Sequence, residues 1–230
     1  MENYSYIKKN YDELVEEIRL LGEKYGREVT LVAVTKSGSD EELLALAGVG
    51  ASDIGENRPQ ELVRRGNLLS EKGFTPRLHE IGNLQRNKVK SIIGSVHLIH
   101  SLDSYSLALE IDKQAKLVGR KVPVLIEVNS AAEEAKGGIA PEECEEFYQK
   151  ISRLDSLLIS GIMTMGPVVD DPEEMRPYFR LTKELFDKMN EKYGFEQGGI
   201  LSMGMSDSYR VAIEEGATLV RVGRMIFNKR

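Results

Sequence analysis

The sequence has very little cysteine and no long apolar run. Cys144 is its only cysteine, so no disulfide can form within the chain, and a reducing compartment is expected. No stretch approaches the roughly 20 apolar residues that a membrane-spanning helix needs. The start of the chain, Met1 to Asn10, is polar and carries no apolar signal core. We therefore expect a cytoplasmic protein that does not associate with membranes.

An excess of positive charge is also missing. The chain has 31 basic and 37 acidic residues and a net charge of −6, which argues against nucleic-acid binding because phosphate backbones need a positive protein face. The single cysteine and the lack of a close group of histidines and carboxylates argue against a metal site. His97 and His100 are three residues apart on one predicted strand and should face opposite ways.

What the sequence does contain is a repeated alternation of short apolar strands and amphipathic helices, with no linker or change of composition. We predict one domain over residues 1–230. The eight predicted strands are Leu31–Lys36, Ser52–Asn57, Arg77–Gly82, Val96–Leu102, Pro123–Asn129, Leu158–Met165, Ile200–Met205 and Leu219–Gly223.

Helices between consecutive strands predict a parallel sheet, because parallel neighbours need a crossover connection. Eight such units favour a single (β/α)8 TIM-type barrel with an extra N-terminal helix, and an open doubly wound sheet is the alternative. Ile7, Leu14 and Leu21 lie at helical spacing in the opening helix. This helix either takes the place of a missing last helix or covers the barrel floor.

The chemistry of a parallel barrel is expected at the carboxyl ends of its strands. Lys36 ends the first strand on the face of Val32 and Val34. If that face points inward, the amine is partly desolvated, which lowers its pKa and makes it a nucleophile for an aldehyde. The alternative is an ordinary solvated lysine. Polar residues also lie near the ends of other strands, at Asn57, His79, Asn129, Ser202 and Arg221, and His79 could equally be a structural histidine.

The loops after the last two strands predict a phosphate site, since this is where such barrels usually bind phosphate. They span residues 202–207 and 221–224 and contain Gly204 and Gly223, which let the backbone approach an anion. Ser206 is expected at a helix start, where free N–H groups favour phosphate. Plain turn and capping chemistry would explain these loops equally well. No P-loop or G-x-G-x-x-G motif supports nucleotide binding.

Five motifs in this order resemble one known family. They read LVAVTK at 31–36, GEN at 55–57, HEIGNLQRNK at 79–88, LSMGMSD at 201–207 and VRVG at 220–223. The chain is similar over nearly its whole length to the pyridoxal-phosphate homeostasis protein family, which resembles the N-terminal barrel of alanine racemase. The order and combination of the motifs are specific, although each motif alone is not.

The resemblance implies that the cofactor is pyridoxal 5′-phosphate (PLP), held as a Schiff base on Lys36. Arg221 would face the pyridine nitrogen, and Ser202 would hold the phosphate with backbone amides of the last loop. Lys136 matches a lysine common near the site. The implied cofactor-binding residues are Lys36, Asn57, His79, Ser202, Met203, Ser206, Arg221, Gly223 and Arg224.

The sequence departs from the family pattern at four positions. Gly38 stands where a second lysine often follows, and Leu78 stands where the family has an aromatic residue. Arg224 replaces the threonine of the phosphate loop, and Asn228 replaces a glycine. Loss of the threonine hydroxyl removes one expected side-chain contact to the phosphate, for which the charge of Arg224 would compensate unless it points outward.

An arginine at the pyridine nitrogen disfavours protonation of the ring and weakens it as an electron sink. Alanine racemase also uses a tyrosine from a second domain, for which this chain has no room. We therefore expect a PLP-binding protein of intracellular PLP homeostasis or delivery, without fast catalysis, which would act as a monomer or weak dimer and could serve PLP-dependent apoenzymes. The alternatives are a weak PLP-dependent amino-acid racemase, a Schiff-base aldolase and a purely structural interaction protein.

Overall fold

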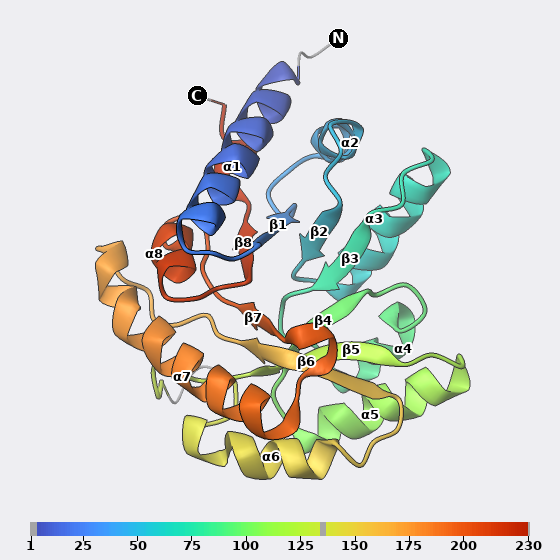
Figure 1. The fold of residues 1–230 in the computed structure, drawn as a ribbon. Coiled ribbons are helices and arrows are strands. Elements are labelled where there is room, and N and C mark those ends of the chain that lie inside the picture. The colour runs from blue at the N-terminus through green and yellow to red at the C-terminus, as the bar shows by residue number, and fades with distance from the viewer. Residues whose placement is uncertain (1–3, 134–136, 230) are drawn as a thin grey trace.

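A computed structural model describes residues 4–133 and 137–229. Within them, eight parallel strands pair in chain order, and β8 also pairs with β1 to close a barrel (Figure 1). The strands are β1 (Thr30–Val34), β2 (Asp53–Glu56), β3 (Arg77–Glu80), β4 (Leu98–Leu102), β5 (Val122–Glu127), β6 (Leu157–Met163), β7 (Ile200–Ser202) and β8 (Leu219–Val222). Closure confirms the predicted barrel and excludes the open sheet.

Helices surround the barrel and connect its strands. They are α1 (Ser5–Lys24), α2 (Asp40–Gly48), α3 (Pro59–Glu71), α4 (Arg86–Ile92), α5 (Tyr105–Leu117), α6 (Cys144–Ile151), α7 (Arg176–Tyr193), α8 (Tyr209–Glu214) and α9 (Arg224–Phe227), with 3-10 turns η1 (Pro141–Glu143), η2 (Pro172–Met175) and η3 (Glu196–Gly198). Residues at the N-termini of two helices explain where these helices begin. Ser39 caps α2 reciprocally with Glu42, and Pro59 is the first residue of α3.

Helix α1 packs beside α2, α8 and α9, and Figure 1 shows it on the side of the barrel where the C-terminal segment also lies. The helix after β8, α9, has only four residues. The side chain of Asn10 donates to the backbone carbonyls of Ile226 and Asn228, at 3.1 and 3.0 Å. α1 therefore takes the place of a full last helix, as the first of the two predicted positions proposed.

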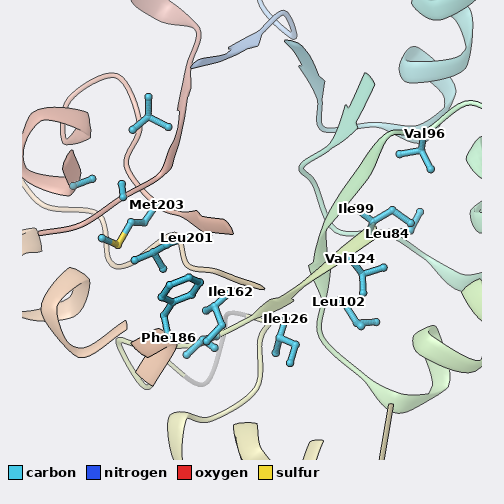
Figure 2. Packing of buried hydrophobic residues seen from close by; sticks show 14 of the residues in the cluster. Leu84, Val96, Ile99, Leu102, Val124, Ile126, Ile162, Phe186, Leu201 and Met203 are labelled. Atoms are coloured by element: carbon cyan, nitrogen blue, oxygen red, sulfur yellow. The ribbon is translucent and has the colours of Figure 1, made fainter. Parts of the chain in front are cut away.

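The apolar core has two parts. The larger part lies between the strands and the helices, and Figure 2 shows a portion of it, with Leu201, Met203 and Phe186 together. The smaller part joins one residue from each of five strands: Val32, Leu98, Leu125, Met163 and Leu219. Only the barrel interior can bring strands from opposite sides of the ring together. This inner cluster leaves other inward positions for polar residues.

Seven of the eight strands end earlier at the mouth of the barrel than the sequence predicts, and β4 ends at Leu102 as predicted. β1 stops at Val34, and the amide of Gly38 donates to the carbonyl of Thr35 at 3.0 Å, so residues 35–38 form a turn. β7 stops at Ser202, and Gly204 has a φ of +92°, which favours glycine. The chain thus leaves the ladder as soon as it reaches the mouth, and the loops there carry the candidate site.

Candidate functional site

Lys36 lies in the turn after β1, and its side chain is exposed. The predicted position in the strand and the predicted desolvation are therefore wrong, because the strand ends two residues earlier and the turn opens to solvent. The turn is nevertheless firmly placed. A Cβ on Gly38 would lie 2.6 Å from the ring of Phe227, so α9 packs directly against it, and a side chain at position 38 would clash.

A buried arginine holds the same turn from the other side. Arg65 of α3 donates to the carbonyl oxygens of Thr35 and Gly38, the latter at 2.7 Å, and to the carboxylate of Glu56 at 2.7 Å. The hydroxyl of Thr35 also donates to Glu56. All four residues are buried. We call Thr35, Gly38, Glu56 and Arg65 the outer clamp, since they lie between the barrel and α3.

The two predicted phosphate loops contact one another. The amide of Gly223 donates to the hydroxyl of Ser206 at 3.4 Å, and Arg224 forms an ion pair with Asp207. A Cβ on Gly223 would lie 2.6 Å from the carbonyl oxygen of Val34, so the last loop adjoins the end of β1, two residues before Lys36. Ser206 is not at the helix start as predicted, because α8 begins only at Tyr209.

A line of hydrogen-bonded polar side chains crosses the barrel interior. Asp53 is 2.9 Å from His79, which is 3.0 Å from His100, and His100 is 3.0 Å from the hydroxyl of Ser202. Arg221 donates to the same hydroxyl. We call these five residues the polar column. All five are buried.

The column begins near the floor and ends at the mouth. At its floor end, Arg77 pairs with Asp53 at 2.6 Å, and both border a cleft of about 680 Å³ beside α1. Burial opposes ionisation of Asp53, but hydrogen bonds from His79, Arg77 and Ser52 outweigh it and hold the carboxyl pKa well below its usual range. At the other end, Arg221 also donates to the carbonyl of Thr164 at 3.0 Å.

Buried titratable groups surround the mouth end. Burial lowers the pKa of Arg221 to about 10, against an opposing effect of Glu127, so the guanidinium stays charged near neutral pH. Burial also raises the pKa of Glu127 to about 7, helped by Asp103 and opposed by Arg221. Glu127 ends β5, and the sequence analysis did not single it out. Its position at a strand end, the feature used to select Asn57 and Arg221, could have found it.

Two predicted cofactor contacts are placed away from the mouth. Both ring nitrogens of His79 bond to protein groups, so the structural alternative applies to this histidine. Met203 is fully buried, and its side chain packs beside Leu201 in the outer core (Figure 2). Met203 directly follows Ser202, the last residue of β7, and belongs to the outer core cluster together with Leu201. Neither side chain is available to a ligand at the mouth.

Three further predicted residues differ in where the structure places them. Asn57 follows β2 directly and is half-buried, and its backbone is packed tightly against Gly82. Ser202 lies at the end of β7, but its hydroxyl bonds to His100 and Arg221 within the polar column rather than facing the loops. Lys136 lies outside the described residues. The outer clamp was also missed, although Leu62, Arg65 and Leu69 share one face of a helical repeat.

Among the described residues, no three His, Cys, Asp or Glu side chains gather in a way that would hold a metal ion. No described helix is long and apolar enough to cross a membrane. The mouth instead combines an exposed amine, a buried guanidinium and two adjoining loops. This set of groups suits an anionic ligand that also carries an aldehyde.

Comparison with known proteins agrees with this chemistry. The profile of the alanine racemase N-terminal domain matches residues 10–230. The pyridoxal phosphate homeostasis protein of Aquifex aeolicus (strain VF5) is 40% identical over 220 residues, covering 94% of this chain and 95% of that protein. The corresponding protein of Helicobacter pylori (strain ATCC 700392 / 26695) is 36% identical, covering 96% of this chain and 98% of that protein.

A solved structure with PLP bound is also similar to this chain. PipY of Synechococcus elongatus PCC7942, in a structure with PLP bound, matches with a TM-score of 0.83 and 25% identity, covering 96% of this chain and 100% of that one. Sequence relatives and solved fold thus cover almost the entire chain. On this evidence the chain belongs to the pyridoxal phosphate homeostasis protein family, with an alanine racemase N-terminal type of barrel.

Proposed function

We propose that this protein binds PLP as a Schiff base on Lys36 and keeps the cofactor available for delivery rather than for rapid catalysis. One observation carries the proposal: the last loop, at Gly223, adjoins the end of β1, so the turn that carries Lys36 and the two loops lie at one mouth. The relatives named for PLP homeostasis, and PipY with PLP bound, support the choice of ligand.

The residues present fit PLP. Backbone groups of the loops, with the hydroxyl of Ser206, provide donors of the kind that bind a phosphate dianion. The closeness of Gly223 to Val34 leaves no space for a side chain there, so only backbone lines that part of the mouth. Arg224 is engaged by Asp207, so we assign the phosphate contact to its backbone amide and not to its charge.

The chain's own residues favour retention over turnover. When bound, PLP supplies an aldehyde for the amine and an aromatic ring that acts as an electron sink. Arg221 can only donate hydrogen bonds, so it disfavours a proton on a ring nitrogen facing it. The exposed position of Lys36 leaves the amine accessible to an incoming acceptor. Together these properties suit a reversible holder that releases its cofactor to PLP-dependent apoenzymes.

Reductive labelling tests the attachment. We expect the protein incubated with PLP to absorb visible light, and borohydride to fix the cofactor on the peptide that contains Lys36. Lys36→Ala should abolish this label, whereas Lys90→Ala, which changes an exposed lysine of α4, should retain it. A label found only on Lys136, or none, contradicts the assignment.

Activity assays separate carrier from catalyst. We expect very slow alanine racemisation, because general acid–base help from an opposite-face tyrosine is worth roughly 10²–10⁴-fold in rate. Arg221→Glu should alter the cofactor spectrum by allowing ring protonation, without creating a good racemase. The same loaded protein should transfer PLP to an apoenzyme. Fast racemisation without transfer would instead support the amino-acid racemase alternative.

A further inference from the structure

The polar column contains two of the chain's three histidines, and its hydrogen bonds have one possible direction at each end. Arg221 donates and cannot accept, whereas the ionised carboxylate of Asp53 accepts and cannot donate. The proton order of the column is therefore set from the mouth towards the floor. The groups between these ends must each accept on one side and donate on the other.

The direction assigns the hydroxyl proton of Ser202. Its oxygen accepts from Arg221, and its other partner among the described residues is Nδ1 of His100, 3.0 Å away. A fully buried hydroxyl normally finds an acceptor, so the hydroxyl donates to that nitrogen. Burial lowers the pKa of His100 well below its usual value, and the positive charge of Arg221 lowers it further. His100 is thus neutral, with its proton on Nε2.

The next link follows from that tautomer. Nε2 of His100 donates to Nδ1 of His79, 3.0 Å away, and Nε2 of His79 then donates to Asp53 at 2.9 Å. Both histidines carry their proton on Nε2, and charge is confined to Arg221 and Asp53. Each interior link is satisfied on both sides, which is the condition for a buried polar network to stabilise one arrangement.

We propose that the polar column is a positioning device for Arg221, which holds the guanidinium at the barrel mouth through Ser202 and His100. This inference rests on the proposed function, because it assigns a role in presenting Arg221 to PLP. It also reassigns Ser202: the hydroxyl predicted to hold the phosphate directs Arg221 instead. Two bonds from the guanidinium are seen among the described residues, and it has five N–H groups, so donors remain for the ligand.

The proton order can be measured without the cofactor. Nitrogen-15 NMR of the histidine rings, in wild-type protein without added PLP, should show His79 and His100 neutral and protonated on Nε2 at pH 7. His97 is the internal reference, since it is exposed and lies 5.4 Å from the ring centre of His79 without a hydrogen bond in the column. Protonation of His100 on Nδ1 would reverse the direction and overturn the proposal.

The variants test the effect on Arg221. His100→Leu removes both links, and His100→Gln keeps one acceptor and one donor. Loss of a buried partner to a charged donor should weaken PLP binding about tenfold or more in His100→Leu and shift the pH profile of the bound-cofactor spectrum. His100→Gln should restore most of the affinity, and His97→Asn should match wild type in both measurements.

The outcomes separate this inference from the proposed function. If wild type does not bind PLP, the proposed function fails, and ring NMR still decides the proton order. If wild type binds and His100→Leu folds but shows unchanged affinity and pH profile, the column is only packing, and the inference fails. If His100→Leu does not fold, Ser202→Ala makes the same test with a smaller change, with Ser202→Thr as the variant that retains the hydroxyl.

Discussion

Two cationic side chains serve the barrel mouth, and each is supported from a different side of the sheet. The outer clamp holds the turn of Lys36 through Arg65, which contacts two carbonyl oxygens and the buried carboxylate of Glu56. The polar column holds Arg221 from inside the barrel through a hydroxyl and two neutral rings. In the outer clamp, the charges of Arg65 and Glu56 are in direct contact. In the polar column, the charges of Asp53 and Arg221 lie at opposite ends, separated by neutral groups.

The surroundings explain this difference. Nε of Arg65 lies 3.8 Å from Asp40 and 3.6 Å from Glu61, both near the surface, so the clamp can draw on half-exposed carboxylates. The middle of the barrel is lined by apolar residues such as Val32 and Leu125, where an unpaired charge would be costly. Neutral relays suit the interior, and ion pairs suit the layer between strands and helices.

The largest expected effect is loss of the clamp. Arg65→Met leaves the carboxylate of Glu56 buried without its cation, and breaking a buried pair in this way costs about 3–5 kcal/mol. Denaturant unfolding should show this loss, and PLP titration should show weaker binding. The matched control is Arg64→Met, because Arg64 pairs with Asp40 and Glu61 at the surface and should cost less than ~1 kcal/mol. Equal losses would remove the distinction between the two neighbours.

Glu80, next to the outer clamp, should make the stability of the protein depend on alkaline pH. Glu80, paired in the sheet with Glu56, is fully buried, and its Oε2 has no hydrogen-bond partner among the described residues. Burial raises its pKa to about 8, with a further increase from Glu56 and opposition from the amide of Gly82. The folded protein thus binds this proton more tightly than the unfolded chain, so stability present at low pH is lost as the pH rises through about 8.

The measurement is the free energy of unfolding of wild type and Glu80→Gln from pH 5 to 9. The difference between them should change by up to ~1.4 kcal/mol per pH unit below the folded pKa, with the variant gaining relative to wild type as the pH rises. Glu71→Gln, at an exposed position at the end of α3, is the control. A constant difference between Glu80→Gln and wild type would show that Glu80 is ionised at low pH in the folded protein.

The column should respond on the acid side instead. The pKa of Asp53 is lowered in the folded protein, so its stabilising contribution is present above the ordinary aspartate pKa and is lost as the pH falls below about 4. Asp53→Asn should cost about 1–3 kcal/mol at neutral pH and flatten the acid loss. Asp155→Asn, at an exposed position, should do neither. If Asp53→Asn loses stability at acid pH as steeply as wild type, the carboxylate of Asp53 is not the ionised group at the floor end of the column.

Particular residues show what sequence reasoning can reach. The eight strands and their order follow from short β-branched runs between helices, but the predicted ends at Lys36 and Met205 overrun the mouth by two and three residues. Alternation continues in the sequence after the chain has left the ladder, because hydrogen bonding to a neighbouring strand is not encoded by one segment alone. The position of Arg221 near the end of its strand was predicted correctly, and the exposure of Lys36 was not predicted.

Partners were harder to predict than positions. His100 and Ser202 are 102 residues apart, and Asp53 and His79 are 26 apart, so their contacts exist only once the barrel has closed. Arg64 and Arg65 are identical neighbours in the sequence, and only helical phase decides which of them is buried. Contacts that depend on barrel closure or on which side of a helix a residue faces can be identified only from the structure. The glycines and strand-end residues of the site can be identified from the sequence.

The smallest effect on PLP binding is expected from a change at Ser206 in the phosphate loops. Its hydrogen bond to Gly223 involves no residue of the outer clamp or the polar column. Its hydroxyl accepts from the amide of Gly223 at 3.4 Å, a long bond whose loss should cost little stability. Ser206→Ala should weaken PLP binding roughly two- to tenfold, the effect of one ordinary hydrogen bond. Pyridoxal, which lacks the phosphate, should bind much more weakly than PLP to wild type and equally to wild type and the variant. Ser70→Ala, on exposed α3 surface, should change neither affinity. If Ser206→Ala weakens both ligands alike, the loops support the whole mouth rather than the phosphate, and the division between clamp, column and loops needs redrawing.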